Sequence, residues 1–147
     1  MRELFVVAAV AAFGLAGCGG SDSTGPSPAP NIAGRWIYGV NLSNAQLQVS
    51  CQGSGEFDVS QSGNSFSGTG SGTMTCTGPG GTFTDATGGS IGGGQISGNR
   101  VTFTDGECSY DGTFSGTPPN RMSGTVGCPV AISGTVYQFT GTWQAGR

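Results

Sequence analysis

Residues 122–125 read Met-Ser-Gly-Thr, one copy of a four-residue unit that recurs along the chain. In every copy an apolar residue and a glycine stand two positions apart, so in a β-strand they share one face. The serine and threonine positions then face the other way, which predicts strands with one apolar and one solvated face. The other copies cover residues 66–69, 114–117, 132–135 and 139–142.

Turn signals between these units predict hairpins and their register. Gly63 and Asn64 suit a two-residue loop, and opposed residues then place Phe57 against Gly70 and Val59 against Gly68. A second hairpin around residues 98 and 99 sets Phe103 against Gly94. A third, turning at Asp105 and Gly106, sets Phe103 against Cys108 and Val101 against Tyr110. Large residues opposite glycine are typical of a tightly curved sheet, because a small barrel interior cannot hold a ring on every strand.

The order of these hairpins predicts an all-β fold, an antiparallel up-and-down meander of about eight strands that closes into a barrel. Serine, threonine, aspartate and glutamine on the outer face argue against a membrane-spanning barrel, which needs an apolar belt there. The strands are expected near 34–41, 45–61, 64–77, 81–96, 99–105, 107–117, 120–130 and 135–144.

Composition limits the classes of function. The chain has 147 residues, 30 of them glycine, with five arginine or lysine residues, eight acids and a formal charge of −3. A surface for nucleic acid or anionic lipid headgroups would need a cluster of cations, so nucleic acid is not an expected partner. The chain has no histidine, which excludes histidine catalysis and histidine metal ligands.

The N-terminus predicts export and lipidation. An uncharged run from Leu4 to Leu15 is about 18 Å long as a helix, too short for a hydrocarbon core of about 30 Å. It ends in Leu15-Ala16-Gly17-Cys18, which resembles the lipobox of bacterial lipoproteins. The alternative is an ordinary signal peptide followed by an unrelated cysteine. The resemblance implies a signal peptide at 1–17, acylation of Cys18 and an anchor in the bacterial cell envelope.

The residue after the cysteine and the linker extend this interpretation. Gly19 favours the outer membrane, with the protein facing the periplasm or the cell surface, by the sorting rule of enterobacterial lipoproteins. Residues 18–33 are expected to be the lipidated cysteine and a Gly/Ser/Pro tether with a reach of about 45 Å. The folded domain is then 34–147.

Four cysteines remain after Cys18, and an even number in an oxidising compartment predicts two disulfides among three pairings. A zinc site is the competing interpretation, but the spacings contain no C-x-x-C pair. The first hairpin register places Cys51 opposite Cys76. The segment Thr-Pro-Pro-Asn at 117–120 provides a turn midway between Cys108 and Cys128. We therefore predict Cys51–Cys76 and Cys108–Cys128, although a bulge at Gly53 or Gly55 would shift the first pair.

Gly34-Arg35-Trp36 opens the domain and Gly141-Thr142-Trp143 closes it. A Gly-x-Trp on the first strand followed by a glycine-rich meander resembles the calycin barrels, the avidins and lipocalins. The resemblance implies that an arginine near the last strand, Arg147 or Arg121, packs over Trp36 as a cation–π contact. The tryptophan-rich biotin pocket of the avidins is not recognisable in this chain.

Two functions follow from this fold. In the first, the barrel binds a small apolar ligand, because the predicted interior carries few charges. The same rings would otherwise fill the core. The candidate lining residues are Trp36, Tyr38, Phe57, Phe103, Tyr110, Phe114 and Trp143. In the second, the protein is a structural or protein-interaction lipoprotein, inhibitor-like, with contacts through the loops at 77–81 and 117–120.

We do not expect an enzyme, a cofactor or a metal site. Glu56, Asp58, Glu107 and Asp111 are predicted to point outward, and solvated carboxylates lack the burial that separates the pKa values of a catalytic pair. Weak calcium binding by Asp105, Glu107 and Asp111 is the competing interpretation of these acids, but we favour solvated surface charges.

Overall fold

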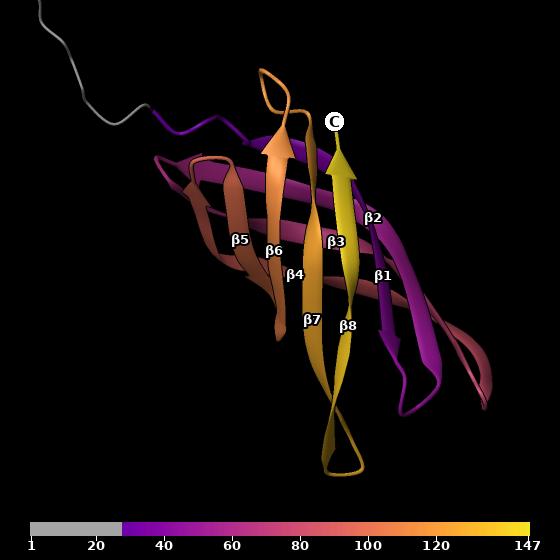
Figure 1. The fold of residues 1–147 in the computed structure, drawn as a ribbon. Coiled ribbons are helices and arrows are strands. Elements are labelled where there is room, and N and C mark those ends of the chain that lie inside the picture. Colours follow the sequence, from indigo (N-terminus) through magenta and orange to yellow (C-terminus); the bar gives the residue numbers. More distant parts are fainter. Residues whose placement is uncertain (1–27) are drawn as a thin grey trace, which may run out of the picture.

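The computed structural model describes residues 28–147, which form one closed barrel of eight antiparallel strands (Figure 1). Each strand pairs with the next along the chain, and β8 returns to pair with β1. The predicted all-β meander and its strand number are therefore confirmed. The strands are β1 Gly34–Asn44, β2 Val49–Ser62, β3 Ser65–Gly78, β4 Gly81–Ser97, β5 Arg100–Asp105, β6 Cys108–Ser115, β7 Arg121–Ile132 and β8 Thr135–Gly146.

Both predicted disulfides are present. Cys51 lies opposite Cys76 with Cα atoms 4.0 Å apart, and Cys108 is bridged to Cys128 with Cα atoms 4.1 Å apart. The two bridges join β2 to β3 and β6 to β7, in both cases across neighbouring strands. The register of the first hairpin is also confirmed, because Phe57 faces Gly70 and Val59 faces Gly68.

Two details of the predicted register are wrong. Phe103 does not face Gly94, because β4 has a bulge between Gly92 and Gln95, and Gly93 there has a positive φ of 58°. The β5–β6 turn consists of Gly106 and Glu107, so Phe103 faces Tyr110 rather than Cys108. The true partner of each β5 residue lies two residues from the predicted one. Because side chains alternate with period two, the residues predicted to point inward still do so.

Inward-facing glycines bring neighbouring strands close together. A Cβ atom added at Gly141 would lie 1.7 Å from the carbonyl oxygen of Asn41, and one added at Gly124 would lie 1.9 Å from that of Asp111. A Cβ at Gly70 would meet the ring of Phe57 at 3.0 Å. Gly141 and Gly124 therefore require glycine, and at Gly70 the Phe57 ring occupies the room that the missing side chain leaves.

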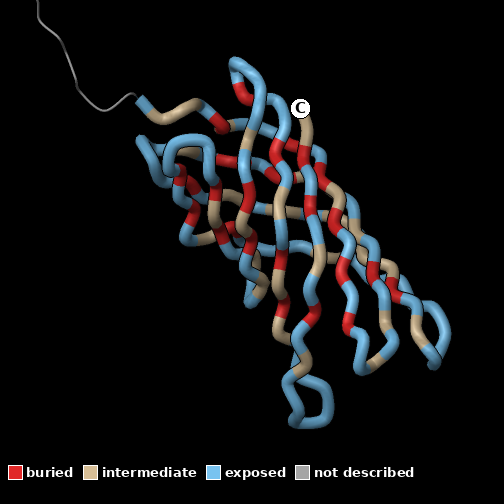
Figure 2. Tube along the Cα trace, viewed as in Figure 1, coloured by how far each residue is buried: buried red, intermediate tan, exposed pale blue. Residues whose placement is uncertain are grey.

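The packed structure begins before the first strand. Ile32 is fully buried, and its N–H donates to Oε1 of Gln61 at 2.7 Å. Figure 2 shows this buried position in the segment that leads into β1. Part of the stretch expected to be tether is therefore part of the barrel's packing, because its one isoleucine is buried at the end of the barrel.

The two ends of the barrel differ. The end reached by the N-terminal segment also holds the C-terminus, the β4–β5 turn and the β6–β7 loop, and we call it the tether end (Figure 1). The other end, called the distal end, carries the β1–β2, β3–β4 and β7–β8 hairpins. The β5–β6 hairpin is shorter, since β5 has 6 residues where β4 has 17. The barrel wall is therefore incomplete at the distal end.

Replacing Gly141 by alanine tests the close approach of the strands. The added methyl must displace the β1 backbone, so we expect a loss of about 1–3 kcal/mol in the free energy of unfolding. Gly39→Ala is the control, since its Cβ would meet nothing closer than 3.9 Å. Urea unfolding measures both, and equal stability of the two variants would contradict the close packing.

Candidate functional site

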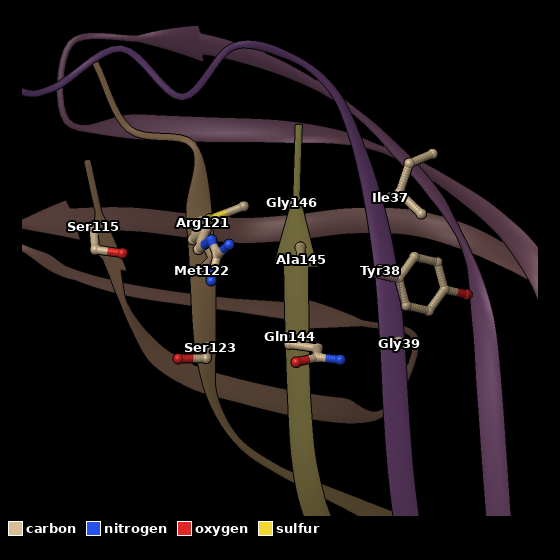
Figure 3. Close-up of a pocket in the computed structure, with 10 residues that line it drawn as sticks. All are labelled: Ile37, Tyr38, Gly39, Ser115, Arg121, Met122, Ser123, Gln144, Ala145 and Gly146. Carbon is tan, nitrogen blue, oxygen red and sulfur yellow. The ribbon is translucent and has the colours of Figure 1, made fainter. Parts of the chain in front are cut away.

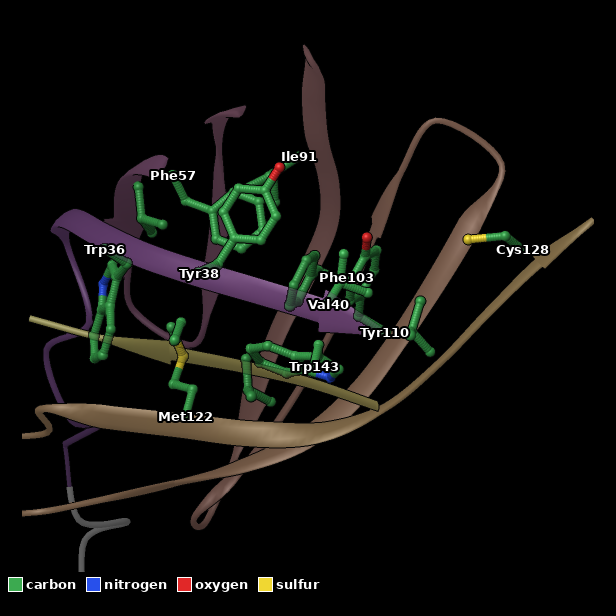
Figure 4. Close-up of a cluster of buried hydrophobic side chains, with 14 of the residues drawn as sticks. Trp36, Tyr38, Val40, Phe57, Ile91, Phe103, Tyr110, Met122, Cys128 and Trp143 are labelled. Carbon is green, nitrogen blue, oxygen red and sulfur yellow. The ribbon is translucent and has the colours of Figure 1, made fainter. Parts of the chain in front are cut away.

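The barrel interior gathers the residues predicted to line a ligand site. Six of the seven are buried, and Phe114 is half-buried. Tyr38 stacks on Phe57 with ring centroids 4.1 Å apart, and Phe103 stacks on Tyr110 at 4.6 Å. Trp143 meets both rings of the second pair edge-on (Figure 4). Because each ring uses its faces and edges on its neighbours, these side chains fill the part of the interior that they share.

Trp36 and Arg147 close the tether end. The indole N–H of Trp36 donates to the carbonyl oxygen of Ile32 at 2.8 Å, and the guanidinium of Arg147 lies 4.4 Å from the centre of the Trp36 ring. Of the two arginines considered from the sequence, Arg147 therefore makes this contact. Its nitrogens also donate to three carbonyl oxygens, those of Asn31, Ala33 and Pro119, at 2.7–2.9 Å. One arginine thus ties the segment before β1 to the β6–β7 loop and to the core.

Tyr110 and Asp105 lie where the wall becomes incomplete. Burial, with a smaller contribution from the charge of Asp105, raises the pKa of Tyr110 to about 12. Burial also raises the pKa of Asp105 above its ordinary value. A Cβ added at Gly89 of β4 would lie 2.5 Å from a carboxylate oxygen of Asp105, so this side chain crosses from the end of β5 to the β4 backbone.

Most acids on the outer wall are ion-paired. Arg35 lies 3.2 Å from Glu56 and 3.8 Å from Asp58, and Nε of Arg100 donates to Asp111 at 2.9 Å. The bond from Arg100 holds the pKa of Asp111 below its usual value. These carboxylates are partly exposed, and their positions match the predicted outward orientation. Within residues 28–147, no three potential metal-ligating side chains come together.

One surface hollow lies on the outside of the barrel. It crosses β6, β7, β8 and β1 and is lined by outward side chains such as Ile37, Arg121 and Gln144 (Figure 3). Most of the predicted aromatic residues are absent from it, with only Tyr38 among its lining residues. The hollow therefore does not open onto the cluster formed by Phe57, Phe103, Tyr110 and Trp143. Open walls of this kind enclose little of a small molecule.

The distal end exposes apolar side chains that were not identified from the sequence. Phe83 is 62% exposed, and Val130 and Ile132 are 39% and 42% exposed. Phe83 faces Cys76 in the β3–β4 ladder, so it lies on the inner side of the wall but has no β5 residue to cover it. The exposure of Phe83 could have been inferred from the sequence, because the strand expected at 81–96 is much longer than its neighbour expected at 99–105.

The predicted loops lie at opposite ends. The loop at 77–81 forms the tip of the β3–β4 hairpin, beside Phe83 at the distal end. The segment at 117–120 lies at the tether end, where Pro119 is buried and accepts a hydrogen bond from Arg147. Of these two loops, only the one at 77–81 is therefore free to contact a partner at the end away from the tether.

Comparison with family models, curated proteins and solved structures finds no match to this chain. Cys18, the predicted lipidation site, and the predicted signal peptide lie outside the described residues. In residues 28–147 no helix is long and apolar enough to cross a bilayer.

Arg147→Met tests the closure of the tether end. The change removes hydrogen bonds to three carbonyl groups and the contact with Trp36, so we expect a loss of about 1–3 kcal/mol in unfolding free energy. Arg35→Met, which removes two exposed ion pairs, should cost under about 1 kcal/mol. Chemical denaturation compares them, and an Arg35 effect equal to the Arg147 effect would overturn this role.

Alkaline titration tests the environment of Tyr110. An unfolded tyrosine loses its proton near pH 10, whereas folded Tyr110 retains it until about pH 12. The folded state is therefore favoured below pH 10, and this contribution is lost as the pH rises towards 12. Rapid unfolding measurements should show a smaller loss across that window in Tyr110→Phe. Identical pH dependence in the two proteins would contradict the assigned environment.

Proposed function

We propose that this protein is a lipid-anchored extracytoplasmic lipoprotein whose barrel serves as a rigid protein-interaction module. The observation that carries the proposal is the contrast between an interior filled by stacked aromatic rings and a distal end that leaves apolar side chains exposed. Large apolar side chains exposed at one end of a domain are candidates for contact with a partner protein.

The position of the tether supports this proposal. Acylation of Cys18 would join the anchor to residue 28 through nine intervening residues, and the described chain enters at the tether end. The distal hairpins would then point away from the membrane towards partners. The closed tether end favours a firm connection between anchor and barrel, since Arg147 holds the entering segment. The Arg147–Trp36 contact also supports kinship with the calycin barrels.

Binding of a small apolar ligand is the second candidate. It is favoured by the convergence of the predicted lining residues in one interior, where the hydroxyl-bearing rings of Tyr38 and Tyr110 belong to the same cluster. A ligand would have to separate rings that now stack on one another, so this function requires rearrangement of the core.

The anchor is tested by Cys18→Ala. We expect the variant to move from the membrane pellet to the soluble periplasmic fraction or the medium, because the acyl chains that hold the protein are lost. Immunoblots of fractionated cells measure this, with Cys51→Ser as a control for the loss of a cysteine. A Cys18 variant that stays fully in the pellet would contradict the anchor.

Crosslinking in cells tests the interaction surface. A photoreactive amino acid at Phe83 should link to a specific protein, whereas the same residue at Ile37 should not. The two side chains are 62% and 60% exposed, but Ile37 is paired with Gly146 near the tether end. Equal crosslinking at both sites would contradict a distal surface. If no protein is crosslinked at either site and native mass spectra of the purified protein show a bound small molecule, the ligand-binding function is favoured instead.

A further inference from the structure

We propose that the free edge of β4, residues 82–90, binds an extended segment of a partner protein that carries lysine or arginine, which joins the sheet as an added strand. The inference rests on the proposed function and names the surface and chemistry through which it acts. The observations that carry it are an unpaired strand edge, an exposed apolar side chain beside it and the distribution of charge.

The free edge arises from unequal strand lengths. β4 pairs with β3 from Gly81 onward, but its pairing with β5 begins only at Ile91, which faces Asp105. Nine residues therefore have a paired strand on one side only, over a length of about 30 Å. All nine are exposed except Thr87, which is half-buried. A strand with a free edge of this length is a template for another strand.

The backbone groups of alternate residues point to the open side. Gly78 and Gly81 close a two-residue hairpin loop as a hydrogen-bonded pair, so Phe83 and Asp85 also direct their backbone groups to β3. Thr82, Thr84, Ala86 and Gly88 then direct theirs away from β3. In agreement, the N–H of Ala86 donates to the carboxylate of Asp85 at 2.9 Å instead of to a strand.

Side chains along the edge favour pairing. The nine residues contain no lysine or proline, the residues that commonly prevent edge-to-edge association, and their single charge is Asp85. Phe83 lies on the same face as Asp85 and is 62% exposed. An added strand would cover this ring with alternate side chains of one face, so an apolar residue and a cation two positions apart fit Phe83 and Asp85.

Charge separates the two ends of the barrel. The four arginines in residues 28–147 all lie in or beside the tether end, at the beginnings of β1, β5 and β7 and just after β8. Two of them form ion pairs, Arg35 with Glu56 and Asp58, and Arg100 with Asp111. The other three acids of this part of the chain are Asp85, Asp105 and Glu107, and none has a cation within 4 Å among the described residues. Asp85 lies on β4, Asp105 ends β5 and Glu107 lies in the β5–β6 turn, so the unpaired acids lie on or near the free edge, which therefore attracts a cationic segment.

A second copy of the chain fits this edge less well. Pairing of two β4 edges would bring the same three acids of each copy to one interface, and neither distal end carries an arginine to offset them. Two-fold pairing of antiparallel strands would also set the two tether ends on opposite sides. A separate protein with a cationic strand is therefore the occupant.

Synthetic peptides test the site on the full-length protein in detergent. The first is a blocked nine-residue peptide, Thr-Val-Thr-Lys-Thr-Lys-Thr-Val-Thr, and the second replaces both lysines with glutamate. We expect the lysine peptide to bind at least tenfold more tightly, with affinity that falls as salt rises. Hydrogen exchange should show protection of Thr82, Thr84 and Gly88 on binding. Equal affinity of the two peptides, or no binding of the lysine peptide, would overturn the proposal.

Two variants locate the binding. Ala86→Pro removes a donor on the open side and leaves the β3–β4 ladder intact, so it should weaken binding at least tenfold, while Ala86→Thr keeps the donor and should bind as the native protein does. If the proline variant does not fold, Asp85→Asn decides the matter. It should reduce the preference for the lysine peptide severalfold, because Asp85 is the acid beside Phe83 while Asp105 and Glu107 remain, and an undiminished preference for lysine would contradict the proposal.

The same variants separate the edge from the proposed function. If the crosslink from Phe83 to a partner persists unchanged in Ala86→Pro, the interaction module stands and the strand-addition site is wrong. If the crosslinked product is a dimer of this chain, the occupant is a second copy and the cationic partner is wrong. Loss of the crosslink in Ala86→Pro but not in Ala86→Thr is the result that we expect.

Discussion

The close approach of neighbouring strands at inward-facing glycines is the constraint on which this barrel depends. At Gly124 and Gly141 no Cβ can fit, because a carbonyl oxygen of the next strand occupies its place. Small residues there allow the wall to curve tightly, and the large rings of other strands then fill the interior. The high glycine content therefore reflects packing as well as turns, since only eight of the glycines described have a positive φ.

The molecule has one sealed end and one open end. At the tether end, Ile32 and Trp36 are completely buried and Arg147 holds the surrounding backbone carbonyls. At the distal end the two disulfides link neighbouring strands close to where the wall becomes incomplete. The bridges stabilise the long hairpins where fewer neighbours pack against them, chiefly by restricting the unfolded chain. The open end can therefore keep a fixed shape without a sealed core beneath it.

The sequence predicted the features that depend on local pairing. Alternation and two-residue loops fixed the face of Phe57, the partner of Cys51 and the number of strands. The same reasoning failed at Gly92–Gln95, because the bulge there depends on contacts with both neighbouring strands. It also failed at the β5–β6 turn, because the pattern allowed either Asp105-Gly106 or Gly106-Glu107 as the two-residue loop. The role of Phe83 was missed because its exposure results from the end of β5, which is a property of the closed barrel. Likewise, burial of Ile32 depends on a site that exists only after the barrel forms.

Residue-resolved hydrogen exchange of the free protein tests the central claim, that the barrel is closed along β4–β5 from Ile91 onward and open before it. The amides of Thr82, Thr84 and Gly88 should exchange rapidly, while those of Phe83 and Asp85, which bond to β3, should be protected. The amides of Val101 and Phe103 in β5 should be protected as part of the closed wall. Uniform protection from residue 82 to residue 90 would show that the edge is already covered. Rapid exchange of every amide there would show that β4 is not a strand before Ile91, and either result would contradict the account.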